Sequence, residues 1–189
     1  MSGIFGMNIK MAIYGESHGK SIGVVLDGLP PGLALDEATI AVEMARRAPG
    51  QNALSTARKE SDMVEIQSGF FNGFTTGTPL CARIVNSDQH SKDYSILADK
   101  MRPGHADYAG HVRYQGFNDY RGGGHFSGRL TAPLVFAGAV AKQALAQYGI
   151  VVGSHILQIN DIKEERFNPM GVSDAELAAL HAKKFVVMD

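Results

Sequence analysis

Apolar residues follow one another along the chain in short runs that predict a mixture of strands and helices. Four runs have the length and the β-branched content of strands, and these are residues 21–28, 63–66, 80–85 and 150–159. The first of them follows an apolar stretch, residues 11–14, and a polar turn at residues 15–19. The pattern therefore predicts several strands that are separated by tight, glycine-containing turns.

Helical spacing appears in four other segments. Asp36 has the features of an N-cap for a helix that stops before Pro49-Gly50, and Ser173 and Glu176 form the sequence of a capping box. The segments are residues 36–48, a short one at 105–114, the long one at 130–148, and 173–183. Because the long segment is small and apolar nearly all round, we expect it to be buried.

The order of these elements favours the α+β class, because strands and helices do not alternate as β-α-β units. The sequence contains no internal repeat and no linker, so we expect a single domain over residues 1–189. Residues 185–188 have the pattern of another strand beginning, which suggests a chain truncated at its C-terminus.

Composition excludes several classes of protein. The 189 residues are 44% hydrophobic and carry a net charge of −1, which argues against binding to nucleic acid or to a membrane surface through bulk charge. No stretch approaches the roughly 18 apolar residues of a membrane span, and the N-terminus lacks a signal-peptide pattern, so we expect a cytoplasmic protein. The single cysteine, Cys81, lies in an apolar run and is predicted to be an inert, buried thiol.

Three histidines lie in glycine-rich turns, which is the strongest chemical signal in the chain. They are His18 within residues 15–19, His105 within residues 102–107, and His125 after Gly122-Gly123-Gly124. Glycine allows a close backbone approach to a ligand, and histidine transfers protons near neutral pH. With arginines nearby, the turns predict acid–base chemistry on an anion, although a polar turn, a capped helix and a flexible loop remain the alternatives for the three sites.

Cationic and hydroxyl side chains extend this interpretation. The triple glycine leads through Ser127 and Arg129 into the long helical segment, a combination that suits phosphate, although it lacks the Gly-Lys-Ser/Thr of a Walker loop. Arg46, Arg47, Arg58 and Lys59 could converge on a polyanionic ligand, and an exposed basic face is the alternative.

Taken together, these strings resemble the chorismate synthase family from about residue 15 to residue 160. The matching strings are Gly-Glu-Ser-His-Gly at 15–19, Arg-Arg at 46–47, Arg-Lys-Glu at 58–60, Thr-Thr-Gly-Thr at 75–78, Arg-Pro-Gly-His-Ala-Asp at 102–107 and Asp-Tyr-Arg-Gly-Gly-Gly at 119–124. The resemblance implies a β-α-β sandwich with mostly antiparallel sheets and flanking helices, assembled as a homotetramer. It also implies a 1,4-anti elimination of phosphate from 5-enolpyruvylshikimate 3-phosphate, with reduced FMN required and NADPH as a candidate reductant.

The resemblance also implies roles for individual residues. His18 corresponds to the histidine that protonates the departing phosphate, and His105 to the one beside the reduced flavin. The substrate-binding positions are Ser17, Arg47 and Arg58, and the cofactor-binding positions are Arg47, His125, Phe126, Ser127 and Arg129. No metal site is implied. His125 departs from the family pattern, which has arginine there.

Family members are much longer than this chain, and their C-terminal half supplies much of the flavin site. Two functional hypotheses therefore remain open: a chorismate synthase portion, and a catalytically inactive fragment that folds and self-associates without tight flavin binding. A third hypothesis is a phosphate-ester hydrolase that uses His18 and His105. Neither a nucleophile nor a metal-ligand spacing supports it.

Overall fold

The computed structural model describes residues 3–48, 62–87, 99–183 and 186–187. The chain divides into two compact units, Met1–Ala141 and Lys142–Asp189, and each is described by itself. The single domain over residues 1–189 stays a prediction. No helix in the described ranges is long and apolar enough to cross a bilayer.

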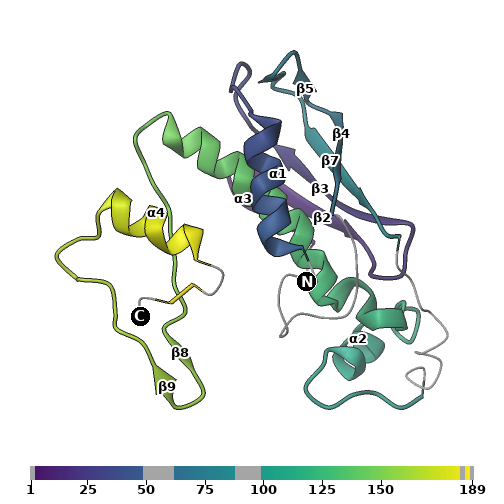
Figure 1. Cartoon of the computed structure of the whole chain (residues 1–189). Coiled ribbons are helices and arrows are strands. Elements are labelled where there is room, and N and C mark those ends of the chain that lie inside the picture. The colour runs from purple at the N-terminus through teal and green to yellow at the C-terminus, as the bar shows by residue number, and fades with distance from the viewer. Residues whose placement is uncertain (1–2, 49–61, 88–98, 184–185, 188–189) are drawn as a thin grey trace. The chain divides into compact units, whose positions relative to one another are not determined.

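A five-stranded antiparallel sheet forms the frame of the first unit, with the strand order β1-β2-β3-β7-β4 (Figure 1). The strands are β1 (Ile4–Phe5), β2 (Lys10–Gly15), β3 (Ser21–Asp27), β4 (Val64–Ser68) and β7 (Leu80–Val85). The predictions for residues 21–28, 63–66 and 80–85 are confirmed within one or two residues at each end. The antiparallel sheets and the α-helices of the described ranges confirm the α+β class.

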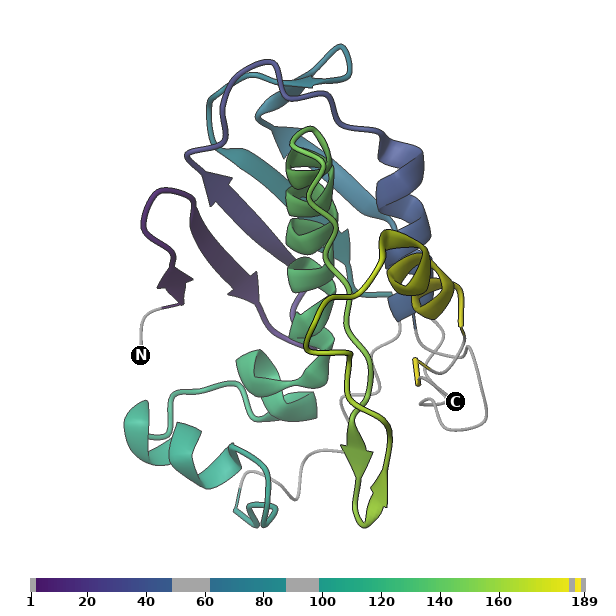
Figure 2. The ribbon, with the colours of Figure 1, turned by 90° about the vertical axis from the view of Figure 1, so that its left-hand side faces the viewer.

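The core lies between one face of this sheet and two helices, α1 (Glu37–Arg47) and α3 (Thr131–Ala146), as Figures 1 and 2 show. Alternate residues of β3 and β7 point to this face because successive side chains in a strand point to opposite sides. The most deeply buried apolar side chains of the core are between 0% and 4% exposed and include Ile22, Val24, Leu26, Ile40, Met44, Leu80, Ile84 and Phe136.

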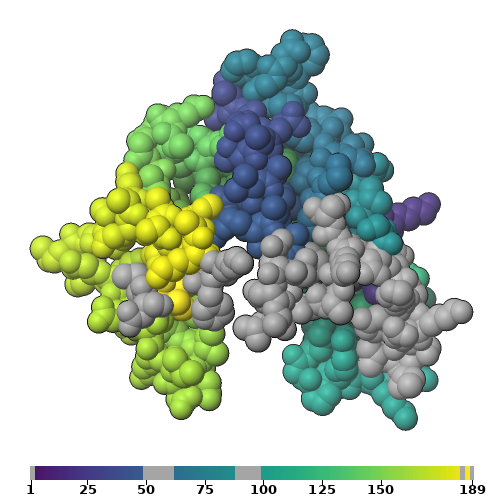
Figure 3. Space-filling model, in the orientation of Figure 1, coloured from purple at the N-terminus to yellow at the C-terminus, as the bar shows by residue number. Residues whose placement is uncertain are grey.

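Helix α1 begins as its sequence predicts. The carboxylate of Asp36 accepts hydrogen bonds from the backbone N–H groups of Ala38 and Thr39, which would otherwise lack helical partners. Ile40 and Met44, one turn apart, are the buried residues of the helix. The helix ends at Arg47, and its opposite side lies at the surface of the first unit (Figure 3).

A short hairpin joins β4 to β7 and is absent from the predictions. Its strands, β5 (Phe70–Phe71) and β6 (Phe74–Thr75), are two residues each, too short for a periodic pattern. The Asn72-Gly73 pair between them has positive φ at both residues, as a tight hairpin turn requires. This pair was the available sequence signal for the hairpin.

Three helical segments lead from the second histidine motif, at residues 102–107, through the third motif into the core. They are α2 (Asp107–Arg113) and two 3₁₀ segments, η2 (Arg121–Phe126) and η3 (Gly128–Leu130), which precede α3. The predicted helix over residues 105–114 is present but shorter, since Ala106 is its N-cap and His105 lies before it.

The prediction that the long helix, apolar nearly all round, is buried is correct for one side of it and wrong for the other. Six residues of α3 are buried, among them Ala132, Phe136 and Val140, whereas Leu134 is 40% exposed and Gly138 and Ala141 are also exposed. These three exposed residues recur at helical spacing, so they share one side. The buried side of the helix packs on the sheet, and its opposite, equally apolar side is exposed in the described residues.

The second unit contains a hairpin and a helix. The predicted strand over residues 150–159 is wrong except at its end, where β8 (Gln158–Ile159) pairs with β9 (Ile162–Lys163). Ile150, Val151 and Val152 are 47% to 55% exposed and pair with no strand in the described ranges, and a strand needs a partner for its backbone groups.

Helix α4 (Asp174–Ala182) confirms the predicted capping box, with Ser173 and Glu176 exchanging hydrogen bonds. Of the predicted strand at 185–188, only Val186 and Val187 lie among the described residues, and they form no strand.

Candidate active site

Two of the three histidines lie against neighbouring glycines of η2. A Cβ atom placed on Gly122 would lie 2.4 Å from Cδ2 of His18, and one placed on Gly123 would lie 2.7 Å from Cε1 of His105. Each ring thus occupies the space that a side chain on these glycines would take. The structure brings together two histidines that are far apart in the sequence.

The backbone of η2 explains why the residues next to the two rings are glycines; Gly122, Gly123 and Gly124 are called the glycine platform below. Gly122, Gly123 and Gly124 have φ angles of 57°, 83° and 55°, a region that residues with a side chain rarely adopt. The carbonyl oxygen of Gly124 also accepts a hydrogen bond from the backbone N–H of Ser17, at 3.0 Å. The triple glycine therefore forms a defined surface next to the two histidine turns. It is not the flexible loop that was considered as its alternative.

His18 is carried by the connection between β2 and β3. This connection closes on itself through a hydrogen bond from the N–H of Gly19 to the carbonyl of Glu16, at 2.9 Å. Ser17 is 1% exposed and His18 is 6% exposed, so both side chains are held inside the protein. A surface histidine on a polar turn, the alternative for this motif, does not describe the structure.

His105 is flanked by a carboxylate and a guanidinium. Nδ1 of His105 lies 2.5 Å from Oδ1 of Asp107, although the angles at this contact are not those of a hydrogen bond. The same carboxylate accepts hydrogen bonds from Nε and Nη2 of Arg102, at 2.8 and 3.0 Å. Asp107 therefore orients two side chains, and it does not cap α2.

These contacts also set the charge of Asp107. The hydrogen bonds from the Arg102 guanidinium hold the pKa of the Asp107 carboxyl well below its usual range, and its partial burial opposes the shift only in part. The carboxylate therefore stays ionised beside His105 over the whole neutral range. Because Nδ1 of His105 faces this carboxylate, Nε2 is the nitrogen directed to the Gly123 side.

A second acid lies beside the platform. Asp119 accepts hydrogen bonds from Nε and Nη2 of Arg121, both at 2.8 Å, and these bonds lower its pKa, with a smaller contribution from the charge of His18. The N–H of Gly123 donates to the carbonyl of Tyr120, which fixes η2 at its start.

The third histidine, His125, contacts the end of β2. Its Nδ1 lies 2.8 Å from the carbonyl oxygen of Gly15, and its side chain lines a cleft of about 360 Å³. The other lining residues are Glu16, Tyr114, Phe117, Asn118, Asp119 and Phe126. Two of the predicted cofactor-binding residues, His125 and Phe126, thus share one aromatic-lined cleft.

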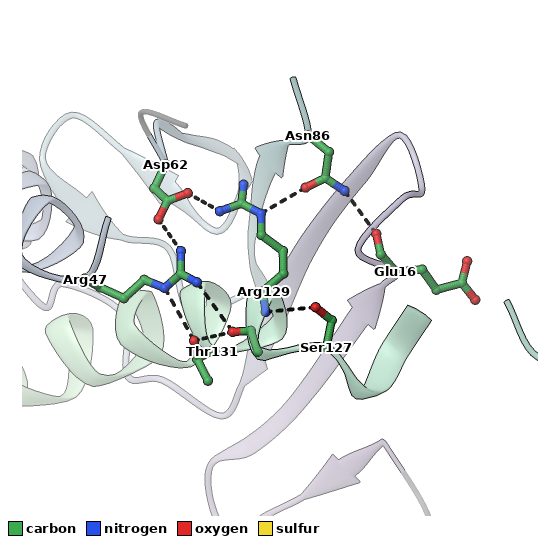
Figure 4. A network of polar contacts seen from close by, with 8 residues as sticks. Glu16, Arg47, Asp62, Asn86, Ser127, Arg129 and Thr131 are labelled. Carbon is green, nitrogen blue, oxygen red and sulfur yellow. Dashed lines mark hydrogen bonds and ion pairs between the residues drawn. The ribbon is translucent and has the colours of Figure 1, made fainter. Parts of the chain in front are cut away.

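The remaining residues predicted to bind the cofactor, Arg47, Ser127 and Arg129, lie at an ionic cluster around Asp62, which Figure 4 shows. Both Arg47 and Arg129 pair with the carboxylate of Asp62, Arg47 through Nη1 at 2.5 Å to Oδ2 and Arg129 through Nη1 to Oδ1. Nε of Arg129 also donates to Oδ1 of Asn86, at 3.1 Å. Ser127 caps η3 by accepting the N–H of Arg129 at 3.3 Å.

Arg47 is the more accessible of the two arginines. Its side chain is 20% exposed, against 3% for Arg129, and its further contacts to Thr131 and Gly128 are long, at 3.4 Å each. Arg58, the other predicted substrate-binding arginine, lies outside the described residues.

The sequence analysis missed Asp62 and Asn86. Asp62 is buried and has a positive φ of 49°, which is uncommon for a residue other than glycine and marks a constrained position. A buried carboxylate is the expected counter-charge for a cluster of arginines, so an acid next to the basic run was the available signal. Asn86 carries no comparable signal, since only the β3–β7 register brings it beside the turn at residues 16–19.

The fold and this site define an α+β protein in which two histidines lie against neighbouring glycines of one loop, and two arginines share the carboxylate of Asp62. Comparison with known proteins gives the family: a model of the chorismate synthase family matches residues 9–187, and the chain belongs to that family.

Several relatives show how much of the family this chain represents. It is 48% identical over 163 residues to the chorismate synthase of Cytophaga hutchinsonii, covering 86% of this chain and 45% of the relative. It is 48% identical over 176 residues to that of Aliarcobacter butzleri, covering 93% and 49%. The chain spans about half the length of these curated relatives.

A solved structure gives the same result for the fold. A crystal structure of chorismate synthase superposes with a TM-score of 0.69 at 28% identity, covering 96% of this chain and 48% of that one.

Proposed function

We propose that this chain carries the two histidines of a chorismate synthase site and takes part in the elimination of phosphate from 5-enolpyruvylshikimate 3-phosphate. The observation that carries the proposal is the meeting of His18 and His105 on Gly122 and Gly123. Acid–base chemistry at one ligand requires its two groups to lie close together, and the family membership supplies the reaction.

In this proposal His18 gives its proton to the departing phosphate. The elimination removes a proton from one carbon and breaks a carbon–oxygen bond at another, so the phosphate oxygen gains negative charge that a proton neutralises. Burial of His18 in a closed turn keeps the ring in one orientation, which is what a positioned acid needs. Ser17, whose N–H is bound to Gly124, is the neighbouring substrate contact.

Arg47 and Arg58 are the proposed partners of the substrate's phosphate and carboxylate groups. The accessible guanidinium of Arg47 is held by Asp62 at one edge, which leaves it oriented but partly exposed. A guanidinium that is already oriented loses less freedom when an anion binds.

Reduced FMN is the proposed cofactor, and the aromatic-lined cleft suits a flat ring system. Tyr114, Phe117 and Phe126 line it together with His125, and rings of this kind pack against a planar aromatic ligand. Phe126 and His125, with Ser127 after them, would hold the flavin in this cleft. Asp107 would orient His105, which the family resemblance assigns to the same cofactor. The chemistry that bound reduced flavin would contribute is a transient supply of reducing equivalents with none consumed, because the elimination involves no net redox change.

The second candidate function is an inactive fragment that folds and self-associates without tight flavin binding. The observation that favours it is the coverage, since the chain spans about half of its relatives. The exposed side of α3 provides an apolar surface through which two copies of the chain could associate. Its residues include Leu134, Gly138 and Ala141.

Two measurements on the purified chain separate these functions. The first is titration with FMN followed by flavin fluorescence, and the second is anaerobic chorismate formation from substrate and reduced FMN. The proposal expects turnover that falls about 10²–10⁴-fold in His18→Ala. His181→Ala is the matched control because His181 lies in α4 of the second unit. Absence of both flavin binding and turnover would establish the inactive fragment, and equal losses in the two variants would remove His18 from the mechanism.

A further inference from the structure

Asn86 is a buried polar residue that neither the sequence pattern nor the proposed function uses. It directly follows β7, and its backbone N–H donates to the carbonyl of Lys20 at 3.2 Å, which continues the pairing of β7 with β3 by one residue. The strand register therefore places its side chain beside the connection between β2 and β3.

The amide of Asn86 holds both ends of the turn that carries His18. Its Nδ2 donates to the carbonyl of Glu16 at 3.0 Å and to the carbonyl of Gly19 at 2.9 Å, and Figure 4 shows the first of these bonds. Only Ser17 and His18 lie between these two anchored residues. A side-chain amide offers two N–H donors, and here each carbonyl takes one.

The third contact of the Asn86 side chain connects this turn to the ionic cluster. Its Oδ1 accepts the Nε–H of Arg129, whose guanidinium pairs with Asp62, and the other oxygen of Asp62 pairs with Arg47. Asparagine is suited to this position because it presents donors to two carbonyls and an acceptor to a guanidinium at once. Both donors and the acceptor of the Asn86 side chain are used, and buried polar groups that are satisfied in this way rigidify the structure around them.

We propose that Asn86 is a positioning residue that fixes Ser17 and His18 against the glycine platform and couples their turn to the Asp62–Arg47–Arg129 cluster. The effect on catalysis rests on the proposed function, whereas the effect on the position of His18 does not. Asn86→Asp is the sharpest test, because the side chain keeps its shape and its acceptor for Arg129. It replaces the amide donor with an oxygen that repels both carbonyls.

The control is Thr75→Val, which removes a buried loop-holding hydroxyl of similar burial elsewhere. Oγ1 of Thr75 donates to the carbonyl of Pro30 at 2.6 Å and accepts the N–H of Leu33 at 3.0 Å. Both variants lose bonds between a buried side chain and a loop, so both should lower Tm by a few degrees, on the order of 5 °C. A purely structural role for Asn86 predicts no further difference between them.

The discriminating readout is the NMR spectrum of the histidine rings and of the backbone amides at residues 16–19, recorded without substrate. Asn86→Asp should shift the His18 ring signals and speed hydrogen exchange of the turn amides, and Thr75→Val should leave both unchanged. Asn86→Ala removes the same donors without adding charge and gives the same result where Asn86→Asp does not fold. Unshifted His18 signals in a folded Asn86 variant would overturn the proposal.

Two further measurements complete the test. In the unsubstituted protein the side-chain N–H signals of Asn86 should exchange slowly with water, and rapid exchange would contradict the two bonds. Where the chain turns over substrate, a folded Asn86 variant should lower kcat by about 10²-fold with a smaller change in KM, the cost of a displaced acid. If turnover is absent in the parent chain but the His18 signals move in the variant, the proposed function fails and the positioning role stands.

Discussion

Substitution of Gly122 by alanine should displace His18 while leaving the fold intact. The added Cβ would lie 2.4 Å from Cδ2 and 2.6 Å from Nε2 of the ring, whereas carbon atoms in contact are separated by about 3.5–4.0 Å. The ring must therefore move by about 1 Å. His18 is buried, so it cannot make this movement by rotating into solvent.

Two costs follow from the substitution and can be separated. The φ of Gly122, 57°, is left-handed, and placing a residue with a Cβ there costs about 1–2 kcal/mol whatever its surroundings. Displacing a catalytic group by about 1 Å costs about 10²-fold in rate, which is a further effect on activity alone.

Gly73→Ala is the matched control. Its φ is 84°, equally left-handed, but a Cβ there meets no atom within 4 Å, and Gly73 lies in the β5–β6 turn. Gly73→Ala should lose about 1–2 kcal/mol, which corresponds to roughly 2–8 °C in Tm. Gly122→Ala should lose at least as much, because its Cβ also crowds a buried ring. Only Gly122→Ala should shift the His18 ring signals in the NMR spectrum and reduce chorismate formation.

Two outcomes for Gly122→Ala would contradict the position or the role of His18. If Gly122→Ala left the His18 signals where they are in the unsubstituted protein, the ring would not lie against this glycine. If the signals moved but turnover stayed within a few-fold of the parent, His18 would be near the platform without acting in the reaction.

Two other predictions concern the buried acids Asp62 and Asp107. Asp62→Asn should destabilise the protein by about 3–5 kcal/mol in chemical denaturation, because it leaves the buried Arg129 without its carboxylate. The control, Glu65→Gln, breaks the exposed pair with Arg83 and should cost at most about 1 kcal/mol. Equal losses in the two variants would contradict the ionic cluster around Asp62. The pKa of Asp107 is lower in the folded protein than in the unfolded chain, so its ionised carboxylate stabilises the fold above about pH 4 and this stabilisation disappears as the pH falls further. Thermal unfolding between pH 7 and pH 3 should therefore be less pH-dependent in Asp107→Asn, and an identical profile would show that Arg102 does not hold the charged form.

Local sequence determined the elements that depend on neighbouring residues. The capping of α1 by Asp36 and of α4 by Ser173 uses contacts within three positions, and both were predicted correctly. Strands β3 and β7 were predicted from their own apolar runs because both are central strands of the sheet. The strand predicted at residues 150–159 failed for the converse reason: its apolar residues were there, but a partner strand is a property of the rest of the chain.

The histidine motifs could also be found in the sequence, since glycine and histidine side by side carry their chemistry locally. Their meeting could not, because it depends on three φ angles in η2 and on the β2–β3 connection reaching that loop. Asp62 and Asn86 belong to the same category. The sequence by itself determined which residue types were available for acid–base and anion chemistry, whereas strand register and the packing of η2 decided which of them touch, because those contacts join segments that no local pattern relates.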